Sequence, residues 1–565
     1  MDFKQLTAAV AFFATLGCAG EPRFPLREPL LRDPDQRPIA GAPEEYYSPF
    51  AWDGANYMVF HPIARFFAVD PAGAAANVNA LDEVPDSSWF VNRLGVHPMT
   101  VAEVEQGPCS NKALDPNLPD GSWTIDKGKD NGANPGFRVN IKGLGKFMLK
   151  TDPETEPDRA TGATAVSARV YHAVGYYSAC DTVVYFRPAL LKLKPGLTVT
   201  NNQGVTSAFD QARLNAILRG ASHRNGLVRM VASTWLEGKP IGPYRYEGTR
   251  DDDPNDVIPH EDRRELRGAR LVAAWLNHFD TREQNTMDVF MPTDPKRKDG
   301  PGYVRHYIID MGDSFGSRWS DDEISRRLGH SYIFDGGHVA EDFLTLGTVQ
   351  RPWERAQFST KIFGYFSSRD FDPEAWRGEY PNPAFMRMAE QDGAWMARIL
   401  AKFSDDLVAA AVRAGKYDPG SEAYLTQTLI ERRDLILRRY LSKVSPLNAV
   451  TTDATGVCAL DLARESGVVP SESLSFRAYV YRGASLEPAA KARFRPVPSP
   501  RVCLDIAHAS LSPALPPGAP ERCLVVDITN GYAPGPLRLH LYDLGPERGY
   551  RLAGVERPSA LKPPE

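Results

Sequence analysis

Two short polar groups in the middle of the chain contain residue types that could do chemistry. The first, HFDTREQN at 278–285, contains Asp280 and Asn285. The second, IIDMGD at 308–313, ends an apolar run and contains Asp310 and Asp313. Carboxylate and amide oxygens are hard ligands that suit Mg²⁺, and a carboxylate can also accept a proton. The two groups could therefore hold a divalent cation beside a general base.

The pattern H-x-D-x-x-x-x-N followed by D-x-G resembles the active-site residues of the protein-kinase-like superfamily. The longer run IIDMGDSFG at 308–316 is similar to an atypical branch, which includes phosphoinositide-kinase-like, secretory-pathway and spore-coat kinases. The resemblance implies ATP and Mg as cofactors, because phosphoryl transfer depends on positioning and charge neutralisation. It implies that Asp280 accepts the proton of the attacking hydroxyl and that Arg282 neutralises charge on the transferring group. The implied magnesium ligands are Asn285, Asp310 and, less directly, Asp313.

The resemblance also predicts an upstream lobe that binds the phosphates of ATP. Three short strands are expected at 123–125, 137–141 and 147–150. Lys150 ends the third strand, where kinase-like folds carry the lysine that contacts the α- and β-phosphates. The loop 126–136, with Lys129 and Gly132, lies where the phosphate-covering loop should be, because glycines let backbone N–H groups approach phosphates.

The usual glutamate partner of that lysine is harder to identify. The Ala-rich segment 160–174 is free of proline and predicts a helix, but it contains no acidic residue. Glu154, Glu156 and Asp158 lie just before it and are the nearby candidates. This departure from the family pattern leaves open whether the protein is catalytically active.

The first 20 residues predict export. Lys4 precedes an apolar run that is too short to span a membrane, as in a secretory signal peptide. Cys18 resembles the lipidation site of a bacterial lipoprotein, and cleavage after Ala19 is the alternative. We expect a lipoprotein of the bacterial cell envelope or a secreted protein, with no transmembrane helix in the mature chain. Outside the cytoplasm, the five remaining cysteines allow at most two disulfides and one free thiol.

Composition and element pattern indicate an α+β protein with several domains. We expect a leader at 1–20 and a proline-rich tether at 21–50, and the resemblance implies a two-lobed protein-kinase-like fold after them. Its lobes are the N-lobe with an N-terminal extension at 51–237 and the helical C-lobe at 238–445. A small all-β, sandwich-like domain follows at 446–565. The net charge of −5 argues against nucleic acid as a partner.

Three functions remain open from the sequence. The first is an exported, membrane-tethered kinase-like protein that transfers the ATP γ-phosphoryl group to a hydroxyl of an unknown protein, lipid or glycan. The second is a catalytically inactive kinase-fold lipoprotein that binds a nucleotide or another ligand, an alternative motivated by the scarcity of ATP in a bacterial envelope. The third is a structural or adhesive surface lipoprotein whose β-sandwich binds a partner.

Overall fold

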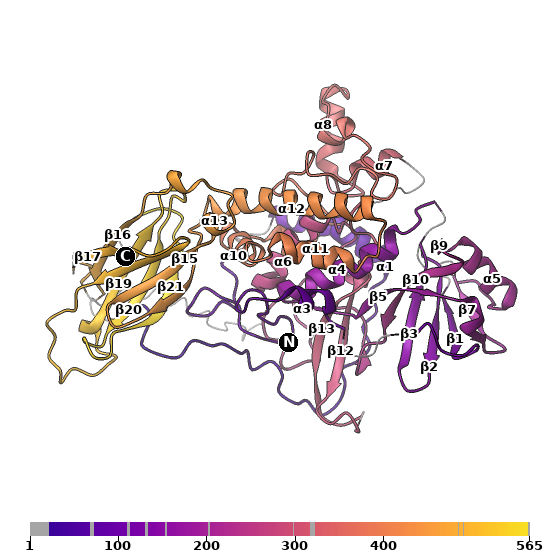
Figure 1. Cartoon of the computed structure of the whole chain (residues 1–565), viewed down its shortest axis with the longest axis horizontal. Helices are drawn as coiled ribbons and strands as arrows, with labels where there is room; N and C mark the ends of the chain where they lie inside the picture. The colour runs from indigo at the N-terminus through magenta and orange to yellow at the C-terminus, as the bar shows by residue number, and fades with distance from the viewer. Residues whose placement is uncertain are drawn as a thin grey trace, which may run out of the picture.

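The structure is a computed structural model of the chain. It describes residues 22–67, 73–109, 114–129, 134–152, 155–201, 204–297, 299–316, 322–483, 485–489 and 491–562. These residues form a mixed α and β protein with several separate sheets, which agrees with the expected α+β class. Figure 1 shows a sheet at one end, a helical region in the middle and a β-rich C-terminal region at the other end.

The first sheet contains the three strands expected upstream of the 278–285 group. Its path runs β5-β10-β3-β2-β1-β6, and β9 (His223–Arg224) pairs with β10. The strands are β1 (Trp123–Lys129), β2 (Gly136–Ile141), β3 (Gly145–Lys150), β5 (Asp181–Phe186), β6 (Leu191–Leu193) and β10 (Leu227–Thr234). Trp123, Phe137 and Phe186 are fully buried in its core. The expected loop 126–136 was wrong at its start, because β1 continues to Lys129 past an irregularity after Ile125.

Helix α4 (Arg159–Val174) separates β3 from β5 in the chain and confirms the expected helix. Every residue of α4 except His172 is buried, as expected for a helix enclosed on all sides. Gly162 is needed for this packing, because a Cβ there would lie 2.3 Å from the ring of Tyr417. The small residues of α4 therefore let it pack between the first sheet and the helical region.

The helical region is built around α6 (Arg264–Leu276), α10 (Glu390–Leu400), α11 (Asp405–Arg413) and α12 (Pro419–Leu441). Trp275 and Trp395 are fully buried in its core. Ser404 caps α11 by accepting a hydrogen bond from the backbone N–H of Leu407. Below these helices in Figure 1, β12 (Thr286–Pro292) and β13 (Gly302–Ile308) form an antiparallel hairpin. The hairpin belongs to a second sheet of order β11-β12-β13-β4, with β11 (Lys239–Pro240) and β4 (Tyr177–Ser178).

The C-terminal region consists of two four-stranded sheets that share one hydrophobic core. One has the order β14-β15-β18-β17, with β14 (Leu447–Thr452), β15 (Gly456–Asp461), β17 (Ala492–Arg495) and β18 (Arg501–Ile506). The other has the order β16-β19-β20-β21, with β16 (Arg477–Arg482), β19 (Cys523–Thr529), β20 (Leu537–Asp543) and β21 (Tyr550–Glu556). Two sheets packed through one apolar layer make a β-sandwich.

The proline-rich segment 22–49 lies against the folded body. Phe24 packs on the ring of His540 in the sandwich, with ring centroids 4.6 Å apart. Further along, Ile39 forms an isolated bridge with Gly302 at the β12–β13 hairpin. The segment then leads into the short helices α1 (Phe50–Ala55), η1 (Asn56–Phe60) and α2 (His61–Phe67). It thus runs from the sandwich to the middle of the molecule.

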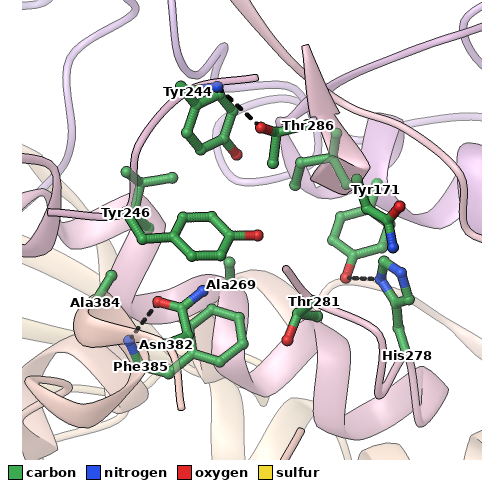
Figure 2. A pocket seen from close by; sticks show the side chains of 13 residues that line it. Tyr171, Tyr244, Tyr246, Ala269, His278, Thr281, Thr286, Asn382, Ala384 and Phe385 are labelled. Atoms are coloured by element: carbon green, nitrogen blue, oxygen red, sulfur yellow. Dashed lines mark hydrogen bonds between the residues drawn. The ribbon is translucent and has the colours of Figure 1, made fainter. Parts of the chain in front are cut away.

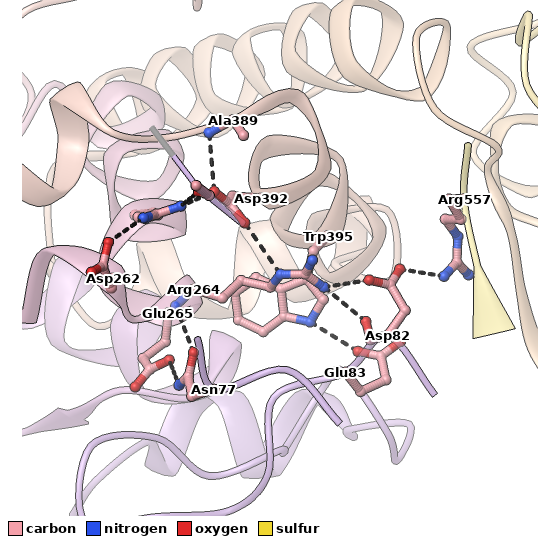
Figure 3. A network of polar contacts seen from close by, with 12 residues as sticks. Asn77, Asp82, Glu83, Asp262, Arg264, Glu265, Ala389, Asp392, Trp395 and Arg557 are labelled. Carbon is pink, nitrogen blue, oxygen red and sulfur yellow. Dashed lines mark hydrogen bonds and ion pairs between the residues drawn. The ribbon is translucent and has the colours of Figure 1, made fainter. Parts of the chain in front are cut away.

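A polar network around Asp82 connects the sandwich to the helical region (Figure 3). Asp82 accepts ion-pair contacts from Arg264 at 2.6 Å, from Arg398 at 3.1 Å and from Arg557 at 2.6 Å. These arginines come from α6, from α10 and from the end of the sandwich. Burial alone would raise the pKa of Asp82, but the three guanidinium groups outweigh it and hold that pKa well below its ordinary value.

Two disulfides are formed by four of the described cysteines, Cys109 with Cys180 and Cys458 with Cys503. Cys523 is a buried free thiol. This agrees with the sequence-based maximum of two disulfides and one thiol, and disulfides are typical of proteins outside the cytoplasm. Cys18 lies outside the described residues. No helix within the described ranges has the length and apolar character that crossing a membrane requires.

Candidate functional site

The two polar groups found in the sequence lie side by side because a hairpin joins them. Helix α6 ends at Leu276, and Asn277 adopts a left-handed conformation that turns the chain into the 278–285 loop. Strands β12 and β13 then carry the chain out and back. The N–H of Ile309 donates to the carbonyl of Asn285 at 2.9 Å, which fixes the start of the second group against the end of the first.

Asp280 is held in a fixed position within the 278–285 loop. Arg282 contacts both of its carboxylate oxygens, with Nε 2.8 Å from Oδ1 and Nη2 2.8 Å from Oδ2. The side-chain amide of Asn285 donates to the backbone carbonyl of Asp280 at 2.6 Å. Burial raises the pKa of Asp280, and Arg282 opposes this rise. Asp280 thus has the raised pKa of a buried carboxylate that could serve as a base.

Lys150 and Asp310 form the contact that joins the first sheet to this loop region. The Nζ of Lys150 donates to Oδ1 of Asp310 at 2.6 Å. The Lys150 ammonium lowers the pKa of Asp310 and outweighs the effect of burial. Asp310 has a φ of 56°, a left-handed conformation that is uncommon for a residue other than glycine. Such backbone strain is often found at functional sites.

Two further carboxyl groups lie close to Asp280. Burial and the neighbouring Asp280 carboxylate raise the pKa of Asp313 to about 7, although Arg159 lies 3.9 Å from its Oδ1. The same two causes, burial first, raise the pKa of Glu379 to about 8. The backbone N–H of Glu379 donates to the carbonyl of Phe279 at 2.7 Å, which places its side chain against the loop. At neutral pH Glu379 is therefore mostly protonated and Asp313 is about half protonated.

Glu379 was not predicted from the sequence. It reaches the site through a close backbone approach at Gly378, where a Cβ would lie 2.9 Å from Oγ1 of Thr281. Glu379 follows Asp280 by about a hundred residues and belongs to no recognised motif. In the sequence Glu379 lies between Gly378 and Tyr380. A glycine next to polar and aromatic residues is also common in surface turns, so this pattern does not indicate a functional residue.

The structure describes two of the three residues predicted to bind phosphate. Lys150 lies in the site, as described above. The Nζ of Lys129 donates to the carbonyl of Asn134 at 2.9 Å, and its charge also lowers the pKa of Asp310. Gly132 lies outside the described residues. Lys129 thus contributes positive charge near Asp310 from the hairpin between β1 and β2.

Two of the three acidic residues considered as partners of Lys150 pair with arginines. Glu156 contacts Arg159 at 2.8 Å. Asp158 contacts Arg229 at 3.3 Å. Glu154 lies outside the described residues. The carboxylate that Lys150 contacts is that of Asp310.

A cavity of about 350 Å³ opens beside the Lys150–Asp310 pair. Met148 and Lys150 of β3 contribute one wall, and Met287 of β12 and Ile309 contribute another. The connection that follows β10, residues 234–236, also lines the cavity. The cavity therefore lies between the first sheet and the hairpin sheet, and apolar side chains surround the Lys150–Asp310 pair and the carboxylate of Asp181. Such a combination is typical of small-molecule sites.

A small cavity of about 30 Å³, lined by tyrosines, lies next to the 278–285 loop (Figure 2). The hydroxyl of Tyr171 lies 3.0 Å from Nδ1 of His278. Burial lowers the pKa of His278 to about 4, so this imidazole is neutral at physiological pH. His278 therefore positions the loop, and it carries no charge toward the carboxylates.

The N-terminal segment also contacts the loop. The side-chain amide of Gln284 donates to Asp53 Oδ2 at 2.6 Å. Glu283 accepts hydrogen bonds from the hydroxyl of Tyr57 and from the backbone N–H of Tyr246. These contacts hold Glu283 and Gln284, which lie between Arg282 and Asn285 in the loop.

Among the described residues, no cluster of three or more His, Cys, Asp or Glu side chains is arranged to hold a metal ion. An ion at this site would therefore depend on two aspartates, an asparagine and oxygen atoms of a ligand. Mg²⁺ is commonly bound in this way, through one or two carboxylates and the phosphates of a substrate. Comparison with known proteins found no matching family model, no similar curated protein and no similar solved structure.

Proposed function

We propose that the protein is an exported, membrane-tethered kinase-like phosphotransferase that uses Mg-ATP and modifies a hydroxyl of a protein, lipid or glycan. The observation that carries the proposal is the 2.6 Å contact between Lys150 Nζ and Asp310 Oδ1 at the edge of a cavity of about 350 Å³. The lysine ends the third strand of its sheet, and the aspartate follows a strand, as the resemblance implies. The two disulfides support an extracytoplasmic location.

The donor set fits a magnesium ion. Asp310 supplies a carboxylate that is 43% exposed. The amide nitrogen of Asn285 is used in a hydrogen bond to Asp280, so its amide oxygen is the atom that would bind a cation. Asp313 supplies a further carboxylate once its proton is released. A bound magnesium ion would neutralise the charge on the phosphates during transfer.

The remaining residues would handle the nucleotide and the acceptor. Lys150 would hold the phosphates at the cavity edge, with Lys129 adding positive charge. Asp280 would accept the proton of the acceptor hydroxyl. Arg282 would release part of its contact with Asp280 and neutralise charge on the transferring group. Asp280 and Asn285 are already held in place by the loop, and positioning of this kind is the main contribution a protein makes to phosphoryl transfer.

A second candidate function is nucleotide binding without catalysis. It is favoured by the two contacts of Arg282 to the carboxylate of Asp280, because they compensate the charge of the proposed base. It is also favoured by the lack of an acidic residue in α4. In this alternative the cavity binds a nucleotide, and Asp280 only supports the loop.

Replacing Asp280 separates the two functions. Asp280→Ala should abolish transfer of labelled phosphate from ATP while Mg-ATP binding persists. Asp294→Ala, on the exposed hairpin tip, is the control that should leave both unchanged. Undiminished transfer by Asp280→Ala would rule out the proposed catalytic role. Nucleotide binding with no transfer by the wild type, over a panel of hydroxyl acceptors, would favour the second function.

A further inference from the structure

The carboxylate that compensates the charge of Lys150 is one that a bound cation would also use. The ammonium group of Lys150 is paired with Asp310, and Asp310 is also the carboxylate best placed to bind a divalent cation. A cation on Asp310 would compete with Lys150 for the same oxygens. The phosphates of a nucleotide would supply negative charge on one side of Lys150, and a second fixed carboxylate would keep its ammonium group beside them once Asp310 is occupied.

Asp181 is a second carboxylate at the same cavity. It begins β5 and is only 2% exposed. In the sheet it pairs with Ser233 of β10, and β10 in turn pairs with β3, which carries Lys150. Asp181, Ser233 and Lys150 all line the cavity of about 350 Å³. The sheet therefore places the carboxylate two strands away from the lysine and beside the same opening.

The position of Asp181 is fixed on both sides. The preceding residue, Cys180, forms a disulfide with Cys109 and accepts a backbone hydrogen bond from Thr234 at 2.9 Å. The guanidinium group of Arg169 donates to the backbone carbonyl of Asp181. These contacts fix the main chain of Asp181. Its side chain lines the cavity.

The electrostatics agree with this placement. Burial raises the pKa of Asp181 to about 6, while a hydrogen bond from Ser233 and the charge of Lys150 favour its ionised form. Asp181 likewise raises the pKa of Lys150, although less than Asp310 does. Another positive charge brought closer to Asp181 would stabilise the carboxylate further.

We propose that Asp181 is a positioning residue for Lys150, which it holds beside the phosphates when Asp310 binds the divalent cation of a nucleotide. The inference rests on the proposed function, since it requires Mg-ATP in the cavity. Lys150 exchanges one carboxylate partner for another within the cavity. Asp181 thus compensates the charge of Lys150. Helix α4 cannot do so because it contains no acidic residue.

The test is a titration of the full chain with ATP at several Mg²⁺ concentrations. In Asp181→Asn, Lys150 stays on Asp310 and competes with the cation, so the Mg²⁺ concentration for half-maximal ATP binding should rise about tenfold or more. Asp181→Glu keeps the charge and should restore most of the wild-type response. Ser233→Ala, which removes only the hydrogen-bonding hydroxyl, should give a smaller rise of about two- to threefold.

The outcomes distinguish this inference from the proposed function. If the wild type binds no Mg-ATP, both fail. If the wild type binds Mg-ATP and Asp181→Asn shows the same Mg²⁺ dependence, only the role of Asp181 fails. If Asp181→Asn does not fold, a crystal structure of the wild type with Mg²⁺ and a non-hydrolysable ATP analogue decides. Lys150 Nζ should then form an ion pair with Asp181, and a lysine still paired with Asp310 would overturn the inference.

Discussion

Lys150 and Asp310 are 160 positions apart in the sequence, and their side chains meet at 2.6 Å. The contact joins the end of β3 to the residue that follows β13, so it links two separate sheets across a cavity. Neither sheet alone could form the site. The proposed binding of a nucleotide depends on this pair.

Arg282 should set the pH range in which Asp280 acts as a base. Burial raises the pKa of Asp280, and Arg282 is the first of the groups that oppose the rise. Without the guanidinium group the pKa rises further, so Asp280 becomes ionised only at higher pH. In Arg282→Ala, we expect the acidic limb of kcat/KM for Mg-ATP hydrolysis to move upward by about one pH unit.

Arg282→Lys is the matched control for that prediction. It retains a positive charge without the two-point contact, so its acidic limb should lie between those of the wild type and Arg282→Ala. Activity falls in both variants if Arg282 also faces the transferring group. An acidic limb that stays in place while activity falls would contradict the assignment of Arg282 as the group that controls Asp280.

Asp82 should be essential for joining the sandwich to the helical region. Three arginines surround it, and Asp82→Asn removes the carboxylate that all three share, although Arg264 still contacts Asp392 and Arg398 still contacts Glu83. We expect this variant to lose about 3–5 kcal/mol of unfolding free energy in chemical denaturation at pH 7. Asp120→Asn, which removes an exposed partner of Arg187, is the control and should cost less than about 1 kcal/mol.

The same network predicts how stability changes with acid. The folded-state pKa of Asp82 is lowered, so its contribution is fully present above the unfolded pKa, about 3.9, and is lost as pH falls toward the folded pKa. The difference in unfolding free energy between wild type and Asp82→Asn should therefore shrink below about pH 4. A difference that does not change between pH 7 and pH 3 would exclude an ionic role for Asp82.

Cys523 should react with thiol reagents only after the protein unfolds. Cys523 is buried, and burial raises the pKa of its thiol to about 11, so it should resist thiol reagents in the native state. In a Cys18→Ser chain kept free of reductant, we expect no reactive thiol before unfolding and one after unfolding. Two or more thiols after unfolding would show that one of the disulfides is absent.

The Cys109–Cys180 disulfide should contribute to stability as well. It closes a separation of 71 residues and connects the loop after α3 (Val101–Gln106) to the start of β5. The Cys109→Ser, Cys180→Ser double variant should lose about 2–5 kcal/mol of unfolding free energy. Denaturation of this variant and of the wild type under identical conditions measures the loss, and equal midpoints would contradict the prediction.

Much of the secondary structure could be predicted because local pattern determines it. The strands expected at 137–141 and 147–150 and the helix expected at 160–174 all correspond to elements of the structure. Asp280, Asn285 and Asp310 could be found together because their spacing forms one motif. Their convergence follows from a hairpin, which is a local structure.

The rest depends on contacts between distant segments. Nothing in the sequence near Glu379 indicates that it packs against Phe279, and nothing near Asp181 indicates that it shares a cavity with Lys150. The segment 22–49 has the composition of a tether, yet individual residues such as Phe24 pack on the sandwich. Single long-range contacts of this kind have no periodicity, so a sequence pattern cannot reveal them.

Binding of Mg-ATP by the cavity beside Lys150 and Asp310 can be measured by isothermal titration of the full chain. We predict saturable binding by the wild type and binding at least about tenfold weaker in Lys150→Met, which removes a charged partner of the phosphates. Lys146→Met, which changes an exposed lysine on the same strand, should bind like the wild type. No binding by the wild type, or equal binding by Lys150→Met, would contradict the account.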